Sequence, residues 1–430
     1  MMPSVSPRTR DGAIDALRAD AVALSREWMN RIDLERLIGD HVNGLEEGDV
    51  DVVAIGKAAL EMARATRQVL GPRVRREFIV VDTPGRGPDE SEFDVWIGDH
   101  PIPGVASLAA GERLVDFLEQ VTAAQTTLFL VSGGASSLCV RPAPPLTLED
   151  LAEVWRVTLR AGLDITALNR LRASTSMISG GAVLRHVRTP SSLTLVMVDN
   201  VISGAPWVGS GLTYEFQPSR ADIDGQLDAL GPLATPLRER MVEAFEQRRL
   251  WMVRSAPSRH RNEVVAEPAL MLELTIAAAE RLGYRVVSLG AAMHGDVEEM
   301  TREWAQTLKG QGAVGDRLCV VGVGEATVRV TGTGEGGRCQ EFAWRMAAEL
   351  ARLDRDAVFV ARSSDGRDFV EGVGGAWSDS RSLIRCGAVG LDWATLADNH
   401  DTLSGLRALG QLLTGGHTGW NLCDLYVSVM

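Results

Sequence analysis

Residues 128–137 read Leu-Phe-Leu-Val-Ser-Gly-Gly-Ala-Ser-Ser, and this stretch decides the fold class that the sequence predicts. Its four apolar residues indicate a buried strand, which runs directly into a loop of small residues. Such a loop lets the backbone approach a ligand closely, and its N–H groups and Ser hydroxyls can surround phosphate oxygens. A tight Gly/Ser turn after a core strand would have the same sequence. Both interpretations stay open for this stretch alone.

The composition is that of an ordinary globular protein, with 45% hydrophobic and 23% charged residues. A length of 430 residues predicts two domains, because single cores rarely grow so large. The net charge of -13 argues against a nucleic-acid-binding surface. No apolar run is long enough for a transmembrane helix, and residues 1–9 lack the core of a signal peptide. We therefore expect a cytoplasmic protein that binds neither nucleic acid nor membrane.

The chain has only two lysines, Lys57 and Lys309, so nearly all of its positive charge is Arg. Lys57 follows a Gly and lies between an expected strand, residues 51–55, and an expected helix, residues 58–69. The spacing is not that of a Walker P-loop. A lysine in this position can meet an anion together with the free N–H groups of the helix start. A solvated lysine at a helix start is the alternative.

Further apolar runs at residues 77–81, 94–97 and 193–198 predict strands that alternate with helices. This pattern indicates a parallel sheet with helices on both faces, whose ligands bind beyond the carboxyl ends of the strands. Asp199 follows one of these strands directly. It is a candidate Mg²⁺ ligand or catalytic base, or else it caps the next turn.

A second α/β region follows, with expected strands at 285–289, 317–321, 327–331, 358–362 and 425–430 and an expected helix at 341–353. Its Gly-rich segments surround Glu325 and Arg338. An Arg behind glycines at a helix start is suited to bidentate capture of a phosphate or carboxylate. A surface Arg paired with Glu341 is the alternative.

Taken in order, the motifs resemble those of the glycerate 2-kinase family over almost the whole chain. They are GKAA near residue 57, GDHPIPG at 98, LVSGGASSL at 130, LNxLR at 168, SGG at 179, SGL at 210, GEATVxVTGxGxGGR at 324, SDGxD at 364 and TGxHTGxN at 414. The resemblance implies a Rossmann-like domain over residues 1–250 and a C-terminal α/β domain over 251–430, facing each other across a cleft. The MOFRL region would cover about 315–430.

The resemblance also implies an ATP- and Mg²⁺-dependent kinase that phosphorylates a hydroxyl of D-glycerate. Lys57 and Arg338 would act on the transferred phosphoryl group, Asp199 as base or metal ligand, and Glu325 and Asp365 as nucleotide- or metal-assisting residues. The implied phosphate- and substrate-binding residues are Ser132, Gly133, Gly134, Ala135, Ser136, Ser137, Ser179, Gly180, Gly181 and Asn421. Nicotinamide binding has no support, because no GxGxxG follows a strand.

Three departures from the family pattern concern the acceptor. Ser179 stands where the family has a lysine, Cys339 replaces an amide, and Trp420 replaces a small residue. Loss of a lysine that pairs with a bound anion leaves the anion unpaired, at a cost of several kcal/mol. We therefore expect an altered acceptor site, for a hydroxy compound larger or less anionic than glycerate. Trp420 would fill space or stack on the substrate.

We accordingly expect a kinase for a small hydroxy acid, with ATP and Mg²⁺ as cofactors. Two alternatives remain: a descendant that binds ligands or regulates without kinase activity, and an enzyme that reuses the cleft for another reaction. The expected partner is a small-molecule substrate, and the sequence leaves a homodimer open.

Overall fold

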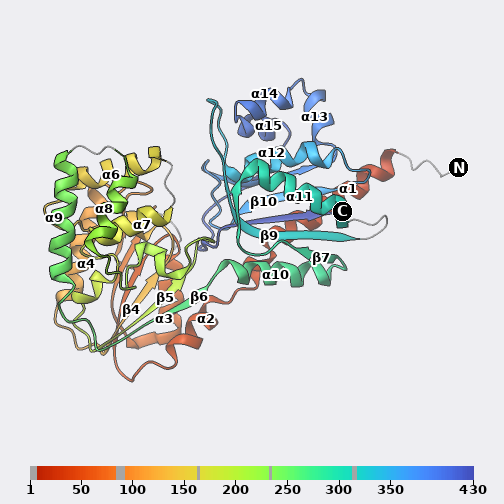
Figure 1. Ribbon diagram of the computed structural model, residues 1–430. Coiled ribbons are helices and arrows are strands. Elements are labelled where there is room, and N and C mark those ends of the chain that lie inside the picture. The colour runs from red at the N-terminus through yellow and green to blue at the C-terminus, as the bar shows by residue number, and fades with distance from the viewer. Residues whose placement is uncertain (1–6, 84–92, 162–164, 232–234, 312–316) are drawn as a thin grey trace. The chain divides into compact units, whose positions relative to one another are not determined.

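The computed structural model describes residues 7–83, 93–161, 165–231, 235–311 and 317–430, which form two compact units (Figure 1). Unit 1 consists of Met1–Ile32, Asn200–Ile202 and Glu267–Met430. Unit 2 consists of Asp33–Asp199 and Ser203–Ala266. That residues 1–250 and 251–430 act as separate domains stays a prediction.

Unit 2 is built on a six-stranded sheet in which every neighbouring pair is parallel. Its strands are β1 (Val50–Ile55), β2 (Val74–Val81), β3 (Val95–Ile97), β4 (Thr126–Val131), β5 (Ser191–Met197) and β6 (Arg259–Ala266). Every residue of β1 and β4 is buried, as expected for strands covered on both faces. The predicted α/β class with a Rossmann-like parallel sheet is confirmed.

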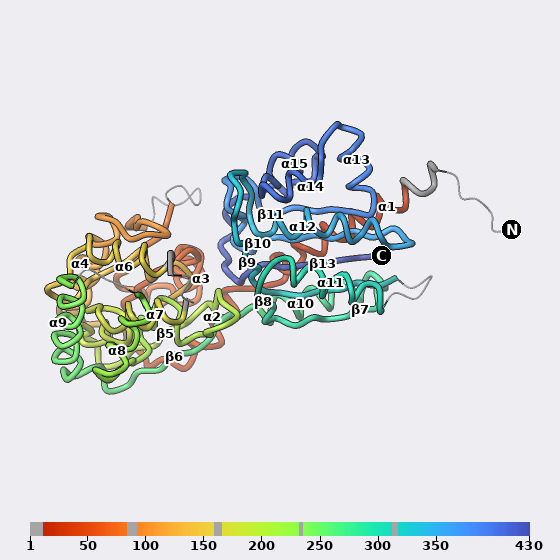
Figure 2. Tube along the Cα trace, turned by 45° about the horizontal axis from the view of Figure 1, so that its top comes forward, coloured from red at the N-terminus to blue at the C-terminus, as the bar shows by residue number. Residues whose placement is uncertain are grey.

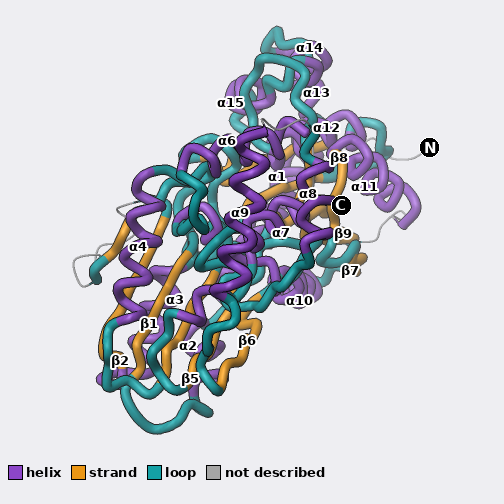
Figure 3. Tube along the Cα trace, turned by 60° about the vertical axis from the view of Figure 1, so that its left-hand side comes forward, coloured by secondary structure: helices purple, strands orange, loops and turns teal. Residues whose placement is uncertain are grey.

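Helices pack along this sheet (Figure 3). They are α2 (Leu34–Val42), α3 (Ala59–Leu70), α4 (Val105–Glu119), α5 (Ala135–Leu138), α6 (Leu148–Ala161), α7 (Ile165–Ser174), α8 (Arg220–Ala229) and α9 (Thr235–Trp251), with 3₁₀ turns η2 (Gly71–Arg73), η4 (Ala182–Arg185) and η5 (Ala205–Ser210). One hydrophobic core joins Leu114 of α4 to Phe78 and Phe129 of the sheet. A satellite core lies among α6 to α9, around Phe245.

The strand order, β3-β2-β1-β4-β5-β6, places a topological switch between β1 and β4. From β1 the chain builds outward through β2 and β3, and from β4 it builds in the other direction through β5 and β6. The loops after β1 and β4 therefore diverge at this point, which is where open α/β sheets bind ligands. Lys57 lies in the first of these loops, and the small residues that follow Val131 form the second.

Unit 1 contains a seven-stranded mixed sheet of order β12-β11-β10-β13-β9-β7, with β8 paired to β9. The strands are β7 (Arg285–Ser288), β8 (Met293–Asp296), β9 (Leu318–Thr327), β10 (Val358–Ser363), β11 (Val373–Asp379), β12 (Leu412–Thr414) and β13 (Asp424–Val429). The helices are α1 (Pro7–Glu27), η1 (Trp28–Asn30), α10 (Pro268–Arg281), α11 (Val297–Gln311), α12 (Arg338–Leu350), α13 (Ser382–Ala388), α14 (Trp393–Asp398) and α15 (Thr402–Ala408). Among the described helices, none combines the length and apolarity that crossing a membrane requires.

The predicted strand over residues 327–331 is wrong. Strand β9 ends at Thr327, and the backbone that follows it is irregular. The ladder of β9 with β13 has already ended at Gly324, and its ladder with β8 ends at Thr327. Residues 328–331 therefore have no strand to pair with, although their side chains alternate in polarity.

The N-terminal helix α1 belongs to the C-terminal unit, where it contacts β10 and β13 (Figure 2). The Trp28 ring, fully buried, meets the Trp420 ring edge to face with centroids 6.1 Å apart. The Ser25 hydroxyl accepts a hydrogen bond from Arg362 Nε, at 3.0 Å. Residues separated by almost the whole chain thus share one core.

We predict that Trp28→Ala lowers the free energy of unfolding by about 3–5 kcal/mol, because it empties a large buried volume. The double variant Trp28→Ala/Trp420→Ala should lose less unfolding free energy than the sum of the two single variants. The ring contact should give a coupling energy of about 0.5–1.5 kcal/mol. Urea denaturation of both single variants and of the double variant measures this coupling. Val121→Ala, at a fully exposed position, is the control. Strict additivity would contradict the contact.

Candidate functional site

The loops after β1 and β4 are bonded to each other at the topological switch. The Ala58 N–H donates to the Ser132 hydroxyl at 3.0 Å, and the Lys57 N–H donates to the Gly133 carbonyl at 2.9 Å. Gly56 has φ of +133°, and a Cβ there would lie 2.2 Å from Ser132 Oγ. Only glycine fits between the two loops at this position. The pairing fixes the Lys57 backbone against the small-residue loop.

The Lys57 side chain lies against the middle of the second loop. A Cβ built on Gly134 would be 3.4 Å from Lys57 Cγ and 3.3 Å from His100 Cδ2. Lys57 is partly buried. The Asp99 carboxylate accepts hydrogen bonds from the N–H groups of Ala106 and Ser107 at the start of α4. Asp99 thus caps a helix, while His100 comes beside Lys57.

The small-residue loop turns into the short helix α5 at Ala135, so its serines have different environments. Ser132 is fully buried and accepts the bond from Ala58. Ser137 is buried and donates to the Gly134 carbonyl at 3.0 Å. Ser136 alone among the three is partly exposed. It is therefore the serine of this loop that can touch a ligand.

A chain of polar side chains runs inward from Ser136. Ser210 Oγ lies 2.8 Å from Ser136 Oγ and 3.0 Å from Asn169 Oδ1. Arg172 donates to the same Asn169 oxygen at 3.3 Å, and its guanidinium stacks on the Trp155 ring. In the sequence, LNxLR and SGL are recognisable only as family motifs. Their connection to Ser136 appears only in the fold.

The glycines at 180 and 181 join the same assembly. The Gly180 and Gly181 N–H groups donate to the carbonyls of Ser210 and Gly211, at 3.1 and 2.9 Å. Behind them, the buried Arg248 donates to the carbonyls of Ser179 and Gly180, at 3.4 and 2.7 Å. Desolvation lowers the pKa of Arg248 to about 10, so it remains charged at neutral pH.

A second arginine, Arg185, is also buried behind this loop and donates to the Gly181 carbonyl. It forms an ion pair with the half-exposed Glu215, at 2.6 Å. Position 179, where the family has a lysine, is a serine in this chain. Two guanidinium groups, those of Arg185 and Arg248, nevertheless reach the carbonyl side of this loop from η4 and α9. Sequence spacing could not reveal Arg248, because it is 69 residues from Ser179.

Asp199 lies two residues beyond the end of β5, at the same carboxyl edge of the sheet, and is partly exposed. Strand β5 is the direct neighbour of β4, and Val131 pairs with Val196. Asp199 and the small-residue loop therefore follow adjacent parallel strands. A carboxylate at such a position has the chemistry of a magnesium ligand or of a base.

In unit 1, Arg338 begins helix α12 and is held by two carboxylates. Its Nε and Nη2 donate to the fully buried Asp424 at 2.5 and 3.0 Å, and its Nη1 donates to Glu325. The expected alternative partner, Glu341, bonds instead to Arg345. Asp424 was missed from the sequence, because it directly precedes the expected strand at 425–430 and is the first residue of β13.

The start of α12 is capped by another buried carboxylate, Asp368. It accepts hydrogen bonds from the N–H groups of Cys339 and Gln340, at 3.1 and 2.8 Å. Burial and the neighbouring Asp424 raise the pKa of Asp368 to about 6. The predicted site residue Asp365 lies three residues earlier and accepts from Ser363 and from the Arg367 N–H.

Two departures from the family pattern have a packing role. Cys339 is fully buried in the core of unit 1. Trp420 is buried against Trp28, which supports the space-filling interpretation over substrate stacking. Asn421 beside it is also buried, and the following Leu422 N–H donates to Ser364 at 2.7 Å.

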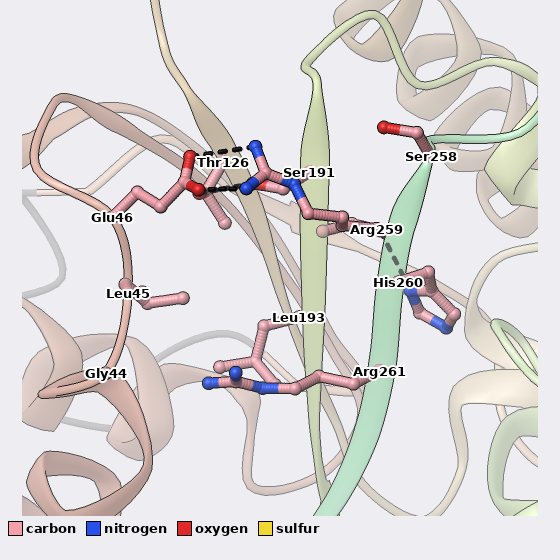
Figure 4. A pocket seen from close by; sticks show the side chains of 11 residues that line it. Gly44, Leu45, Glu46, Thr126, Ser191, Leu193, Ser258, Arg259, His260 and Arg261 are labelled. Carbon is pink, nitrogen blue, oxygen red and sulfur yellow. Dashed lines mark hydrogen bonds and ion pairs between the residues drawn. The ribbon is translucent and has the colours of Figure 1, made fainter.

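Within the described residues, no group of three or more His, Cys, Asp or Glu side chains is placed to hold a metal. A cavity of about 380 Å³ lies at the amino ends of β4, β5 and β6 (Figure 4). There Arg259 pairs with Glu46, and Arg261 reaches toward Gly44. This cavity is at the opposite edge of the sheet from Lys57 and contains none of the predicted site residues.

Both parts of the chain match known protein families. Residues 12–244 match the family described as "Domain of unknown function (DUF4147)", and residues 318–424 match the "MOFRL family". The chain is 24% identical to "D-glycerate 2-kinase" of Thermotoga maritima, over 97% of this chain and 99% of that protein. It is 28% identical to "Glycerate kinase" of Homo sapiens, over 87% and 83% of the two chains. A crystal structure of glycerate kinase from T. maritima, 24% identical, has a TM-score of 0.82 and covers 97% of this chain and 100% of that chain, which shows a shared fold.

We predict that Gly56→Ala lowers the free energy of unfolding by at least about 2 kcal/mol, because the new Cβ collides with Ser132 in a backbone conformation that disfavours side chains. Gly71→Ala is the matched control. That glycine also has a positive φ, but its Cβ would meet open space, so only about 1 kcal/mol is expected. Equal losses in urea denaturation would show that the loops are not in close contact.

Asp368 makes stability depend on pH in a defined direction. Its folded-state pKa of about 6 lies above its ordinary 3.8, so the folded protein favours the protonated form. Wild type should therefore lose stability relative to Asp368→Asn as the pH rises from about 4 to 6, by up to about 3 kcal/mol. Asn keeps an oxygen for the cap. A stability difference that does not change with pH, measured by chemical denaturation, would contradict the burial of a charged carboxylate here.

Proposed function

This chain belongs to the glycerate kinase family, and on that premise we propose that it is an ATP-dependent kinase that phosphorylates a hydroxyl of a small hydroxy acid. The observation that carries the proposal is the bonded pair of loops at the topological switch, which places Lys57 against Gly134. Open α/β sheets bind their ligands at this position. A lysine fixed there can neutralise charge on a transferred phosphoryl group.

The remaining residues keep the roles expected from the family. Asp199 acts as base or metal ligand at the end of β5. Arg338 neutralises phosphoryl charge, with Glu325 and Asp365 assisting. A guanidinium has five N–H groups, and Asp424 and Glu325 take three of those of Arg338. Two N–H groups on its terminal nitrogens are left for an anion, and the side chain is 34% exposed.

The cofactors proposed are ATP and Mg²⁺. The nucleotide supplies the phosphoryl group, and the cation offsets its charge. Asp199 fits the cation in its chemistry, because it is a partly exposed carboxylate at a parallel strand end. Glu325 fits less well, since Arg338 already bonds to it. The protein's own contribution is to position the reactants and to stabilise charge.

The acceptor site is proposed to differ from that of glycerate kinases at position 179. The lysine that the family has there is absent. Arg185 and Arg248 bring two guanidinium groups to the carbonyl side of this loop, and Glu215 is the one carboxylate paired with them. This net positive charge favours an acid as the acceptor. The altered geometry favours an acid that differs from glycerate in size or shape.

The absent lysine also supports a second candidate, a descendant that binds ligands without phosphorylating them. An ATP-consumption screen with Mg²⁺ over D-glycerate, other hydroxy acids and sugar acids separates the two. Turnover with one of these acids supports the kinase. Thermal stabilisation by ATP without turnover on any acid supports the binding protein, and no effect of ATP would overturn both.

We predict that Lys57→Ala abolishes turnover, by at least about a thousandfold, because the transferred phosphoryl group loses its fixed positive charge. The melting temperature should change by no more than a few degrees, since the side chain is only partly buried. Lys309→Ala is the matched control: this exposed lysine on α11 pairs with Glu349, so activity should be kept. Full activity of Lys57→Ala would remove the residue from the mechanism.

A further inference from the structure

Phe369 lies in a turn whose backbone conformation phenylalanine rarely adopts. Its φ is +64°, and across it the Val370 N–H donates to the Asp368 carbonyl at 2.7 Å. A three-residue turn that is closed in this way around a positive φ is the strained form of the γ-turn. Glycine takes such a φ readily, but a bulky side chain makes it an outlier. The chain therefore has a phenylalanine at a position where glycine would fit better.

Packing of the Phe369 side chain does not offset this strain, because the residue is 75% exposed. All the other Phe, Trp and Tyr residues of the chain lie within the described residues and are at least partly buried. An exposed ring in a strained turn has no structural advantage. Strain that a fold retains is frequent where a ligand binds. Phe369 is thus a candidate for contact with a ligand.

The loop that carries Phe369 is held on both sides by the loop after β12. The Gly416 N–H donates to the Gly366 carbonyl at 3.0 Å, and the Gly415 N–H donates to the Gly372 carbonyl at 2.8 Å. The turn is thus anchored three residues before the ring and three residues after it. A ring on an anchored loop loses little backbone entropy when it contacts a ligand, and this favours binding.

The turn also contacts the start of α12. The Asp368 carbonyl that closes the turn accepts a second hydrogen bond from Gln340 Nε2, at 2.9 Å. A Cβ built on Gly337 would lie 2.4 Å from the same carbonyl oxygen. Arg338 follows Gly337 directly, and in the proposed function it neutralises charge on the phosphoryl group. The residue before Phe369 therefore contacts the helix start that carries this cation.

The flat ring of Phe369 distinguishes between the two ligands of such a kinase. A small hydroxy acid has no ring and offers nothing to stack on. A nucleotide carries a purine base, and stacking of a base on an aromatic side chain strengthens binding about five- to a hundredfold. None of the site residues predicted from the sequence is aromatic, so the base has no stacking partner among them.

We propose that Phe369 binds the purine base of the nucleotide by stacking. The ring thereby gives a nucleotide higher affinity than a phosphoryl donor that lacks a base. The inference rests on the proposed function, which supplies the nucleotide. It adds to that function the residue that recognises the base.

Calorimetric titration with MgATP and with magnesium tripolyphosphate, which has the phosphates without the base, tests this assignment. Phe369→Gly removes the ring and suits the turn. It should weaken ATP binding at least about fivefold and tripolyphosphate binding less than about twofold. The melting temperature without ligand should change by no more than a few degrees, because glycine adopts a positive φ without strain.

Two further variants are controls. Phe369→Trp keeps a flat ring at the same position and should bind ATP within about twofold of the wild type. Ile384→Ala removes an exposed apolar side chain from α13 and should leave ATP binding unchanged. Loss of ATP affinity in Phe369→Gly, together with its recovery in Phe369→Trp, is the result that stacking predicts.

Three results would overturn the inference alone. They are ATP binding to Phe369→Gly that equals the wild type, an equal loss of ATP and tripolyphosphate affinity in that variant, and a wild-type affinity for tripolyphosphate that equals the affinity for ATP. If the wild-type protein binds neither ligand and turns over no acid in the ATP screen, the proposed function fails, and this inference fails with it.

Discussion

The structure of unit 2 depends on one close contact, that between Gly56 and Ser132 at the switch between β1 and β4. Two adjacent parallel strands end there, and their loops must diverge to feed helices on different sides of the switch. The absence of a side chain at position 56 lets the loops bond to each other before they separate. Lys57, Gly134 and Ser136 owe their positions to this contact. The proposed chemistry is therefore a consequence of strand order.

Much of the fold could be predicted because local patterns report local properties. Buried apolar runs that end in small residues indicated parallel strands, and the order of the motifs indicated the family. The same patterns could not predict which residues, distant in the sequence, contact each other. Asp424 is 86 residues from Arg338, Arg248 is 69 from Ser179, and Ser210 is 74 from Ser136. Periodicity shows that a residue is buried but not what it contacts. For this reason neither the arginine bonds to the loop at Ser179 nor the contact of Trp420 with Trp28 could be predicted.

The two units differ in the groups that pair with their arginines. In unit 1, one arginine is shared by two carboxylates, and a further carboxylate caps the same helix. In unit 2, two buried arginines face one half-exposed carboxylate, and most of their bonds go to backbone carbonyls. A carbonyl satisfies a guanidinium N–H without cancelling its charge. The two guanidinium groups thus keep their positive charge beside the loop at residue 179, which lacks the lysine.

Hydrogen–deuterium exchange of the whole protein tests the location of the site most directly. In the presence of ATP, Mg²⁺ and D-glycerate, the backbone amides of residues 56–58 and 133–137, at the carboxyl edge of the sheet, should exchange more slowly. Exchange at residues 44–46 and 259–261, around the cavity at the amino edge, should not change. Protection confined to the amino edge, or absent from both loops of the switch while the ligands are bound, would contradict the account.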